Sequence, residues 1–293
     1  MKKLLLMLLT MLLLCAAAAA EIHLIEDESQ LPEGWTEKEL FRLTAIDVNR
    51  SDALLLQCGG ENMMIDGGSQ QYYERLEELF AEKGITEFKM LLNTHPDTDH
   101  IHGLSLMMNR GNYSIGGFYT AVRENFTGSK HHKTAVGVIK KKNIPYVQVF
   151  DGDTLTLGSA TLNLLRCDEN WGTNNRSVVT QVVFGNSKVL LPGDCGNQVL
   201  EYFLENRDHA LLECDILKAT HHGINGFVQE FLDVAQPEFI FVPHVKQNLE
   251  ANKRYFFNNL GAWFCGDGHI IMETDGTDWY IWQLPNWEPK TEK

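Results

Sequence analysis

The sequence predicts one large α/β domain that contains two β-sheets. The chain has 293 residues, of which 44% are hydrophobic, so it can bury a sizeable core. Extended and helical runs alternate in its first half, and a group of short extended runs between residues 146 and 191 predicts a second sheet. No repeat or low-complexity segment interrupts the remainder, so residues 21–293 are expected to form a single domain.

Residues 1–20 have the pattern of a signal peptide. Lys2 and Lys3 precede an apolar run at residues 4–14, and the small residues 16–20 suit cleavage before Glu21. We therefore expect a mature protein that is secreted or located in the cell envelope, without stable membrane insertion after cleavage. An uncleaved anchor is the alternative, because the run 4–20 lies at the short limit for crossing a bilayer, about 17 residues.

The charge of the mature chain argues against avid binding of nucleic acid. Without the two signal lysines, 25 − 2 = 23 basic residues face 39 acidic ones, a net charge of 23 − 39 = −16. Such a surface repels polyanions, so a small-molecule or cell-envelope phosphoester is favoured over duplex nucleic acid as the partner. A local basic group could still hold one phosphate: Arg123, Lys130, Lys133 and Lys140 to Lys142. The cysteine spacing predicts no disulfide framework, and no pattern specifies an oligomeric state.

The first half of the chain predicts strands separated by helices. Residues 21–40 are polar and irregular, and they are expected to contribute little to the core. Strands are predicted at 43–48, 53–58 and 63–68, up to Asn93 and at 117–120, and helices at 70–83, 104–108 and 134–142.

The second half predicts a strand-rich region followed by mixed elements. Turn residues separate extended runs at 147–150, 154–157, 161–165, 177–184 and 188–191. Further strands are predicted at 215–218, 239–242, 262–264, 269–274 and 279–283, and helices at 198–205 and 249–260.

Metal-ligand side chains are most concentrated directly after the strand that ends at Asn93. His95, Asp97, Asp99 and His100 lie within six positions, with His102 just beyond. In a tight loop, the first two can face one metal and the next two another, because alternate residues point to the same side. The alternative is a polar loop with a helix N-cap at Asp99, which leaves the histidines unexplained. The downstream pair His131 and His132 is interpreted as solvated at a helix start, with a substrate contact as the alternative.

Two further strand ends carry residues of the same kind. Asp194 lies in a glycine-rich turn after the run 188–191, where alone it could equally be a helix cap, and His221 and His222 follow the run 215–218. Three strand ends with Asp and His residues in one chain indicate a single site, because loops at such ends usually carry the chemistry of α/β sheets.

These motifs, together with the run Met64-Ile65-Asp66-Gly67-Gly68, resemble the metallo-β-lactamase superfamily in order and separation. Within it, the His95-x-Asp97-x-Asp99-His100 pattern is most similar to the metal-dependent domain of a bacterial DNA-uptake channel protein and to secreted phosphorylcholine esterases. The resemblance extends from about Phe41 to the end of the chain. It implies a four-layer αββα sandwich with a dinuclear metal site at one edge.

The resemblance also implies a role for each ligand. His95 and Asp97 would bind the first metal and Asp99 and His100 the second, with Asp194 as the bridge. One of His221 and His222 would complete the second site; we favour His221 as the ligand and His222 as a neighbour or substrate contact.

Three positions depart from the family pattern. The superfamily's additional histidine is missing, because no histidine lies between His132 and His209. Asp168 or Asn175 would substitute for it, or the first metal would be loosely held. The turn after the first strand keeps only Asp52 of the family pattern, and His102 stands where glycine is common.

The predicted function is an exported hydrolase that depends on two divalent metal ions. Zinc is the first choice, with manganese or iron as alternatives, because the carboxylates suit harder ions. Two cations about 3.5–4 Å apart can bind one hydroxide between them and stabilise both the attacking and the leaving oxygen of a displacement reaction. Asp99 would orient the hydroxide and accept its proton, and His222 or His102 would protonate the leaving group.

Phosphodiester hydrolysis is the predicted reaction, because a dinuclear clamp matches two phosphoryl oxygens and the resemblance is to enzymes acting on phosphoesters. Hydrolysis of a carboxylic ester or lactone is the first alternative. The second alternative is a non-catalytic binding module that keeps its metal for structure alone.

Overall fold

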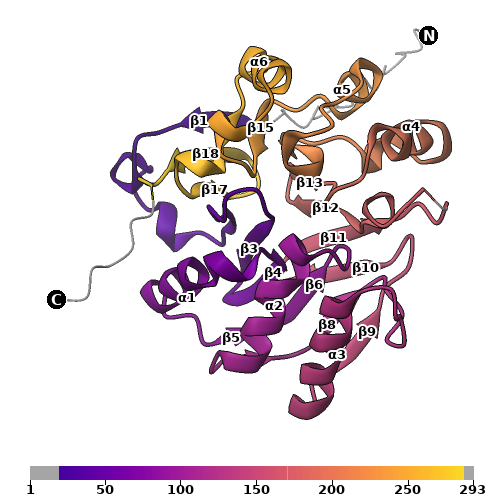
Figure 1. The fold of residues 1–293 in the computed structure, drawn as a ribbon. Coiled ribbons are helices and arrows are strands. Elements are labelled where there is room, and N and C mark those ends of the chain that lie inside the picture. Colours follow the sequence, from indigo (N-terminus) through magenta and orange to yellow (C-terminus); the bar gives the residue numbers. More distant parts are fainter. Residues whose placement is uncertain (1–19, 170, 287–293) are drawn as a thin grey trace, which may run out of the picture.

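The computed structural model describes residues 20–169 and 171–286, which form a four-layer αββα sandwich (Figure 1). This confirms the predicted fold class. The predicted signal peptide lies outside the described residues except for Ala20, so export stays a prediction. Among the described residues, we find no helix with the length and apolar character that crossing a membrane requires.

The first sheet has nine strands in the order β1-β18-β17-β2-β3-β4-β6-β8-β9. Strands β4, β6, β8 and β9 are parallel, whereas β17, β2, β3 and β4 pair antiparallel. The bounds are Glu21–Leu24 (β1), Phe41–Ala45 (β2), Ala53–Cys58 (β3), Glu61–Gly67 (β4), Met90–Asn93 (β6), Phe118–Thr120 (β8), Tyr146–Gln148 (β9), Ile270–Thr274 (β17) and Asp278–Gln283 (β18).

The second sheet has seven strands in sequence order, β10 to β16. Strands β10 to β13 form antiparallel hairpins, and β13 to β16 are parallel. The bounds are Thr154–Leu157 (β10), Ala160–Leu165 (β11), Val179–Phe184 (β12), Ser187–Leu191 (β13), Ile216–Lys218 (β14), Phe239–Val242 (β15) and Trp263–Phe264 (β16). A separate pair consists of β5 (Glu87–Phe88) and β7 (Ser114–Ile115).

Helices cover the outer face of each sheet. Figure 1 shows α1 to α3 grouped on one side of the molecule and α4 to α6 on the other. Their bounds are Tyr73–Glu82 (α1), Thr98–Arg110 (α2), Lys130–Lys142 (α3), Asn197–Asn206 (α4), Gln229–Ala235 (α5) and Ala251–Asn259 (α6).

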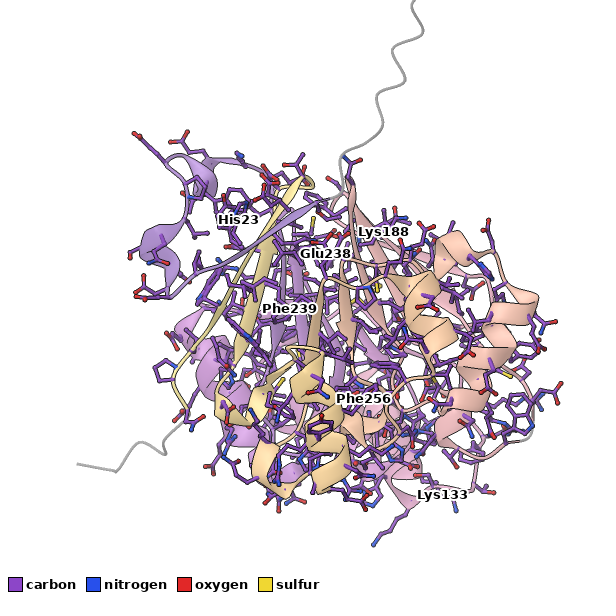
Figure 2. The ribbon with its side chains drawn as sticks, turned by 90° about the horizontal axis from the view of Figure 1, so that it is seen from above. His23, Lys133, Lys188, Glu238, Phe239 and Phe256 are labelled. Carbon is purple, nitrogen blue, oxygen red and sulfur yellow. The ribbon has the colours of Figure 1, made fainter. Side chains whose placement is uncertain are left out.

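The alternation of apolar side chains explains why both sheets are covered on both faces. In β3, Leu54 and Leu56 belong to the cluster between the two sheets, whereas Leu55 packs against the layer of α1 to α3. In β13, Leu190 lies under the opposite helix layer. Successive strand residues point to opposite faces, so continuous apolar runs build three stacked cores. Figure 2 shows Phe239, which belongs to the cluster between the sheets, inside the molecule.

Several predicted local features are corrected by the structure. The segment at 21–40 does contribute to the core, because β1 pairs with β18 and Trp35 is buried. Helix α2 begins at Thr98 instead of residue 104, so Asp99 and His100 lie in a helical turn and not in an alternating loop. His132 was predicted to be solvated at the start of a helix, but it is fully buried, and its Nε2 atom lies 3.2 Å from the Arg123 carbonyl oxygen. Helix α5 was not predicted.

A close approach of two glycines brings helix α2 to the carboxyl end of β4. A Cβ atom on Gly103 would lie 1.8 Å from the Gly67 carbonyl oxygen, so no larger residue fits there without a backbone shift. The Gly103 amide also donates to the Gly68 carbonyl at 2.9 Å. This contact places the first turn of α2 directly above the end of the sheet, where the polar residues of the motifs gather.

Candidate metal centre

The carboxylate of Asp194, in the turn after β13, is the point at which four imidazoles meet. Its Oδ2 atom lies 3.1 Å from Nε2 of His100, 3.2 Å from Nε2 of His222, 3.8 Å from Nε2 of His221 and 3.9 Å from Nε2 of His95. These residues follow β6, β13 and β14, so the two sheets contribute together. The structure thus brings the strand-end motifs into one site.

The unused hydrogen-bonding atoms of this site fit metal ions. The Nε2 atoms of His95, His100 and His222 are buried and have no hydrogen-bond partner among the described residues. Buried polar atoms normally have one. Ligand atoms bound tetrahedrally at about 2.0–2.2 Å from one ion lie roughly 3.4 Å apart, which is close to the separations around Asp194. The arrangement is therefore that of a divalent metal site.

Two carboxylates hold the imidazoles of the deeper half of the site. His100 Nδ1 lies 2.7 Å from Asp66 Oδ2, and His222 Nδ1 lies 3.1 Å from Asp52 Oδ1. All four residues are buried. A carboxylate on Nδ1 fixes the tautomer and directs Nε2 towards a metal. Asp99, from the first turn of α2, contributes an oxygen 3.4 Å from His222 Nε2, and its side chain is 31% exposed.

Asp52 also satisfies the distance criterion for a ligand. It forms a buried group with His100, Asp194 and His222 whose ligand atoms lie within 4.8 Å of one another. Its two oxygens, however, face Lys218 Nζ at 2.7 Å and His222 Nδ1 at 3.1 Å. We therefore interpret Asp52 as the residue that orients His222, and not as a ligand.

The outer half of the site lies at the protein surface. His95 Nε2 is 3.7 Å from Asp97 Oδ2, and the side chains of Asp97 and His221 are 44% and 25% exposed. Asp97 occupies the N-cap position of α2, but its side chain accepts no capping hydrogen bond, so its carboxylate is available for a ligand. The Nδ1 atom of His95 faces hydroxyl groups, Thr94 Oγ1 at 3.1 Å and Ser177 Oγ at 3.3 Å.

Two successive residues in the left-handed region decide which histidine is buried after β14. His221 and His222 have φ values of 47° and 53°. This turn carries the His222 side chain into the deep half, with no exposure, and leaves His221 at the mouth of the site. The geometry therefore favours His222 as the ligand beside Asp99 and His100, whereas the family resemblance had led us to favour His221.

Neither predicted substitute for the missing superfamily histidine is placed to act as one. The Asp168 side chain is 76% exposed and pairs with Arg166 at 3.0 Å. Asn175 already uses both ends of its amide, because Oδ1 accepts from the Gly196 amide and Nδ2 donates to the Trp171 carbonyl. His221 and Asn175 both line the cavity that contains Asp97 and Asp194, and His221 brings its Nε2 atom to 3.8 Å from Asp194 Oδ2.

Burial and charge act in opposite directions on the imidazoles of the site. Burial lowers the pKa of His222, but the carboxylates of Asp194 and Asp52 outweigh it and raise that pKa to about 10. For His100 the same balance, with Asp194 and Asp66, raises the pKa well above its usual range. Burial and the neighbouring His100 lower the pKa of His95 to about 4. Metal ligands bind as neutral imidazoles, so metal binding must release protons from the deep pair.

The buried Lys218 contacts both Asp52 and the turn that carries Asp194. Its Nζ atom donates to the carbonyls of Gly193 and Ala219 and lies 2.7 Å from Asp52 Oδ2 and 4.0 Å from Asp194 Oδ1. Burial lowers its pKa, but Asp52 and Asp194 reverse the shift, so the ammonium stays charged. Lys218 thus holds the turn that presents Asp194.

Sequence reasoning named the ligand candidates but not their supports, which are Asp52, Asp66 and Lys218. Asp66 lies within the run Met64 to Gly68, and its positive φ of 55° is uncommon outside glycine. Its side chain accepts hydrogen bonds from Asn93 Nδ2, Thr94 N and Thr94 Oγ1, in addition to its contact with His100. The feature of the sequence that could have identified Asp66 as a support is its carboxylate at the end of an otherwise apolar strand.

Comparisons with known proteins agree with this architecture. The family profile described as metallo-beta-lactamase superfamily matches residues 46–244. ComE operon protein 3 of Bacillus subtilis (strain 168) is 23% identical over 172 residues, which are 57% of this chain and 21% of that protein. The chain thus spans about a fifth of the length of this curated relative.

Two solved structures are similar in fold. CmlA from Streptomyces venezuelae, a diiron beta-hydroxylase, aligns with a TM-score of 0.51 and 15% identity over 77% of this chain and 53% of its own. The metallo-beta-lactamase fold protein YhfI from Bacillus subtilis aligns with a TM-score of 0.48 and 15% identity over 78% of this chain and 95% of its own. At 15% identity, the match to CmlA shows the fold alone.

Proposed function

This chain belongs to the metallo-beta-lactamase superfamily, as its motifs predicted, and on that premise we propose that it is a two-metal hydrolase that cleaves phosphodiesters. The superfamily consists generally of hydrolases, and a buried cluster of Asp and His side chains provides a divalent metal site. The observation that best supports two ions is the convergence of four Nε2 atoms on Asp194 Oδ2. Four imidazoles around one carboxylate exceed the needs of a single tetrahedral ion.

We assign the ligands as two sets that share Asp194. The deep ion would be held by Asp99, His100 and His222, and the outer ion by His95, Asp97 and His221. In this assignment His221 takes the place of the missing superfamily histidine. Zinc remains the proposed metal, with manganese and iron as alternatives, because the site mixes imidazoles with carboxylates.

When bound, two divalent cations supply an activated water and stabilise the charge that develops on phosphoryl oxygens. Burial raises the pKa of Asp99, but His222 and His100 outweigh this and hold it far below its usual range, so Asp99 is a carboxylate at neutral pH. With its side chain partly exposed, Asp99 can orient the attacking water, but so low a pKa makes it a weak proton acceptor, which argues against that second predicted role. The full burial of His222 argues against its second predicted role as proton donor to the leaving group.

The substrate panel that tests the reaction contains an aryl phosphodiester, an aryl phosphocholine, an acyl lactone, and plasmid and single-stranded DNA. Each is assayed with and without a chelator under the same conditions. We expect metal-dependent cleavage of the aryl phosphodiester. Turnover of the lactone without any phosphodiester would favour the alternative ester hydrolase, and efficient DNA degradation at moderate salt would contradict the electrostatic argument. A structural binding module would turn over none of them.

The metal content is a separate test of the ligand assignment. Elemental analysis of the remetallated protein is expected to give two equivalents per chain, and His221→Ala is expected to lower the content towards one. The variant His131→Ala, which removes an imidazole outside both ligand sets, is the matched control and should retain the content of the wild type. A content below about half an equivalent of any transition metal would contradict the metal site itself.

A further inference from the structure

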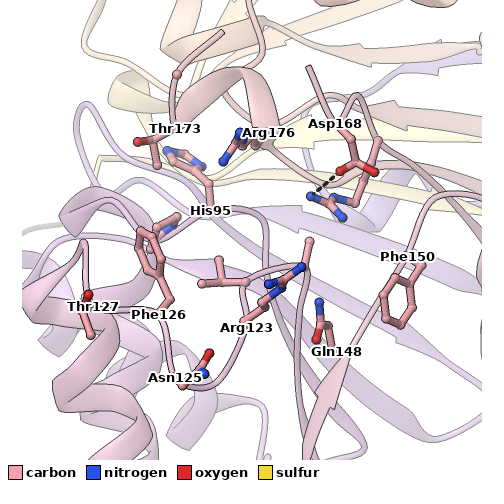
Figure 3. Close-up of a pocket in the computed structure, with 15 residues that line it drawn as sticks. His95, Arg123, Asn125, Phe126, Thr127, Gln148, Phe150, Asp168, Thr173 and Arg176 are labelled. Carbon is pink, nitrogen blue, oxygen red and sulfur yellow. Dashed lines mark ion pairs between the residues drawn. The ribbon is translucent and has the colours of Figure 1, made fainter. Parts of the chain in front are cut away.

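A second cavity, of about 730 Å³, begins beside the outer half of the metal centre. His95 and Pro96 form its inner wall, and its other walls come from loops after β8, β9 and β11 and from the segment before β12. Figure 3 shows His95, Arg123, Arg176 and Phe126 around one space, with Phe150 also on its border. A substrate bound at the metals could therefore extend into this cavity.

The lining of this cavity is basic in a protein that is acidic overall. Arg123, Arg166 and Arg176 line it together with one carboxylate, Asp168, which gives a formal charge of 3 − 1 = +2. The whole chain carries a formal net charge of −14. The three arginines come from three separate segments, so their grouping is produced by the fold. A cationic cavity beside a metal centre attracts anionic groups.

Arg166 is a largely buried cation in the wall of this cavity. Its side chain is only 10% exposed, and its ion-pair partner Asp168 is 76% exposed. Its Nε atom is buried and has no hydrogen-bond partner among the described residues. The backbone of Arg166 is fixed, because its amide donates to Asp151 and its carbonyl accepts from Arg207. A guanidinium held in this way contributes a fixed positive charge to the wall of the cavity.

The cavity also presents two exposed aromatic rings. Phe126 and Phe150 both line it and are 38% and 55% exposed. Figure 3 shows them on different sides of the space, and large exposed apolar side chains often mark a binding surface. A flat ring of a ligand would pack against one of these rings, because aromatic pairs stack or meet edge to face.

We propose that this cavity binds the part of the substrate beyond the scissile phosphate, and that this part carries a flat ring and a second anionic group. The inference rests on the proposed phosphodiesterase function and specifies its substrate class. A carboxylate and a phosphate would both supply the anion. The arginines would disfavour a cationic leaving group such as choline.

The test compares two synthetic phosphodiesters that differ only in the charge of the leaving group. Bis(4-carboxyphenyl) phosphate carries a carboxylate on each ring, and bis(4-methoxycarbonylphenyl) phosphate is its dimethyl ester, whose rings carry no charge. For Arg123→Gln, we expect kcat/KM to fall about tenfold with the carboxylate substrate, mainly through KM, and less than about twofold with the ester. Because each substrate is compared only with itself across variants, the different reactivities of the leaving groups cancel.

Lys133→Gln is the matched control for the loss of one positive charge. Lys133 belongs to the basic group identified in the sequence, but it does not line the cavity. It lies on α3, and Figure 2 shows its side chain pointing away from the body of the molecule. This variant should keep the ratio between the two substrates within about twofold of the wild type. Phe126→Ala should lower kcat/KM for both substrates alike, because both carry the ring. Arg123 and Phe126 are exposed, so neither substitution opens the core. The proposal would be overturned if Arg123→Gln lowered kcat/KM equally for both substrates. It would also be overturned if Lys133→Gln changed the ratio between the substrates as much as Arg123→Gln does.

A binding measurement separates this inference from the proposed function. Calorimetry with 4-hydroxybenzoate, 4-hydroxyphenyl phosphate and methyl 4-hydroxybenzoate requires no turnover and distinguishes the two sources of the anion. We expect the anions, but not the methyl ester, to bind the wild type more tightly than Arg123→Gln. Such binding in a protein that cleaves neither phosphodiester would reject the proposed function and retain the cavity. Turnover of the phosphodiesters without preferential binding of the anions would retain the proposed function and reject the proposed role of the cavity.

Discussion

The two halves of the metal centre differ in what holds their imidazoles. In the deep half, His100 and His222 are fully buried and their Nδ1 atoms face the carboxylates of Asp66 and Asp52. In the outer half, His95 faces only the hydroxyls of Thr94 and Ser177, and its neighbours Asp97 and His221 are partly exposed. The chain therefore uses the same residue type in two environments.

The contrast teaches that the carboxylates around a buried imidazole set its pKa, with Asp194 at Nε2 as the largest raising cause and Asp66 or Asp52 at Nδ1 adding to it. Burial alone lowers the pKa of each of these histidines. Asp194 together with Asp66 or Asp52 reverses the shift for His100 and His222, whereas His95 keeps a pKa of about 4. Carboxylate partners also make an imidazole a stronger ligand. We therefore expect the deep ion to be held more tightly than the outer ion.

The largest expected effect removes the residue that both halves share. Asp194→Ala should lower kcat on the order of a thousandfold, because both proposed ligand sets lose the carboxylate that they share and the two cations lose the negative charge between them. His131→Ala is the control and should stay near the wild type. His132→Ala needs a parallel unfolding measurement, since His132 is buried. Near-normal turnover of the Asp194 variant would show that this carboxylate is not the bridge.

The next effect separates the halves directly. Asp66→Asn should weaken the tighter zinc site about 10- to 100-fold, the range found for carboxylates that orient metal-bound histidines. The matched change in the outer half, Ser177→Ala, should weaken the looser site by less than about threefold, because a neutral hydroxyl contributes little to ligand basicity. Competition with a chromophoric chelator measures both affinities. Equal losses in the two variants would remove the distinction between the halves.

The smallest effect tests the same rule outside the metal centre. His269 is buried, its Nδ1 accepts a hydrogen bond from the Asp47 amide, and burial with the charges of Arg75 and Lys83 lowers its pKa to about 4. The unfolded chain, with a histidine pKa of about 6.5, binds more protons between pH 6.5 and pH 4. Stability is therefore complete above this window and is lost as the pH falls through it.

At pH 5, this loss should amount to about 1–2 kcal/mol in the free energy of unfolding. His269→Asn is the control, because the amide oxygen keeps an acceptor near the Asp47 amide but does not titrate. Chemical denaturation at pH 7 and pH 5 gives the difference between the two proteins, in which all other titrating groups cancel. An identical pH dependence in both would contradict the assigned protonation of His269.

The parts of the site that could be predicted are those set by spacing along the chain. His95, Asp97, Asp99 and His100 lie together in sequence, and the structure keeps them together around the start of α2. The layers were predictable for the same reason, because runs such as residues 53–58 show which segments are buried on both faces. These features depend on local patterns and on apolar burial.

The remaining features depend on register and on single backbone angles. Asp52 meets His222 only because the start of β3 and the end of β14 lie at the same edge of the sandwich. Two consecutive left-handed residues exchange the positions expected for His221 and His222. The basic cavity gathers Arg123, Arg166 and Arg176 across more than 50 residues of sequence. No local pattern contains this information.

The division of the site between the two sheets has a mechanical consequence. His95 and His100 follow the nine-stranded sheet, whereas Asp194 and His222 follow the seven-stranded one. Ions held by both sets would cross-link the layers and close a loop of roughly a hundred residues, a span over which a disulfide is worth about 4.7 kcal/mol. Within the described residues all five cysteines are buried and free. Metal loading, and not cysteine oxidation, would then determine how firmly the two sheets are joined.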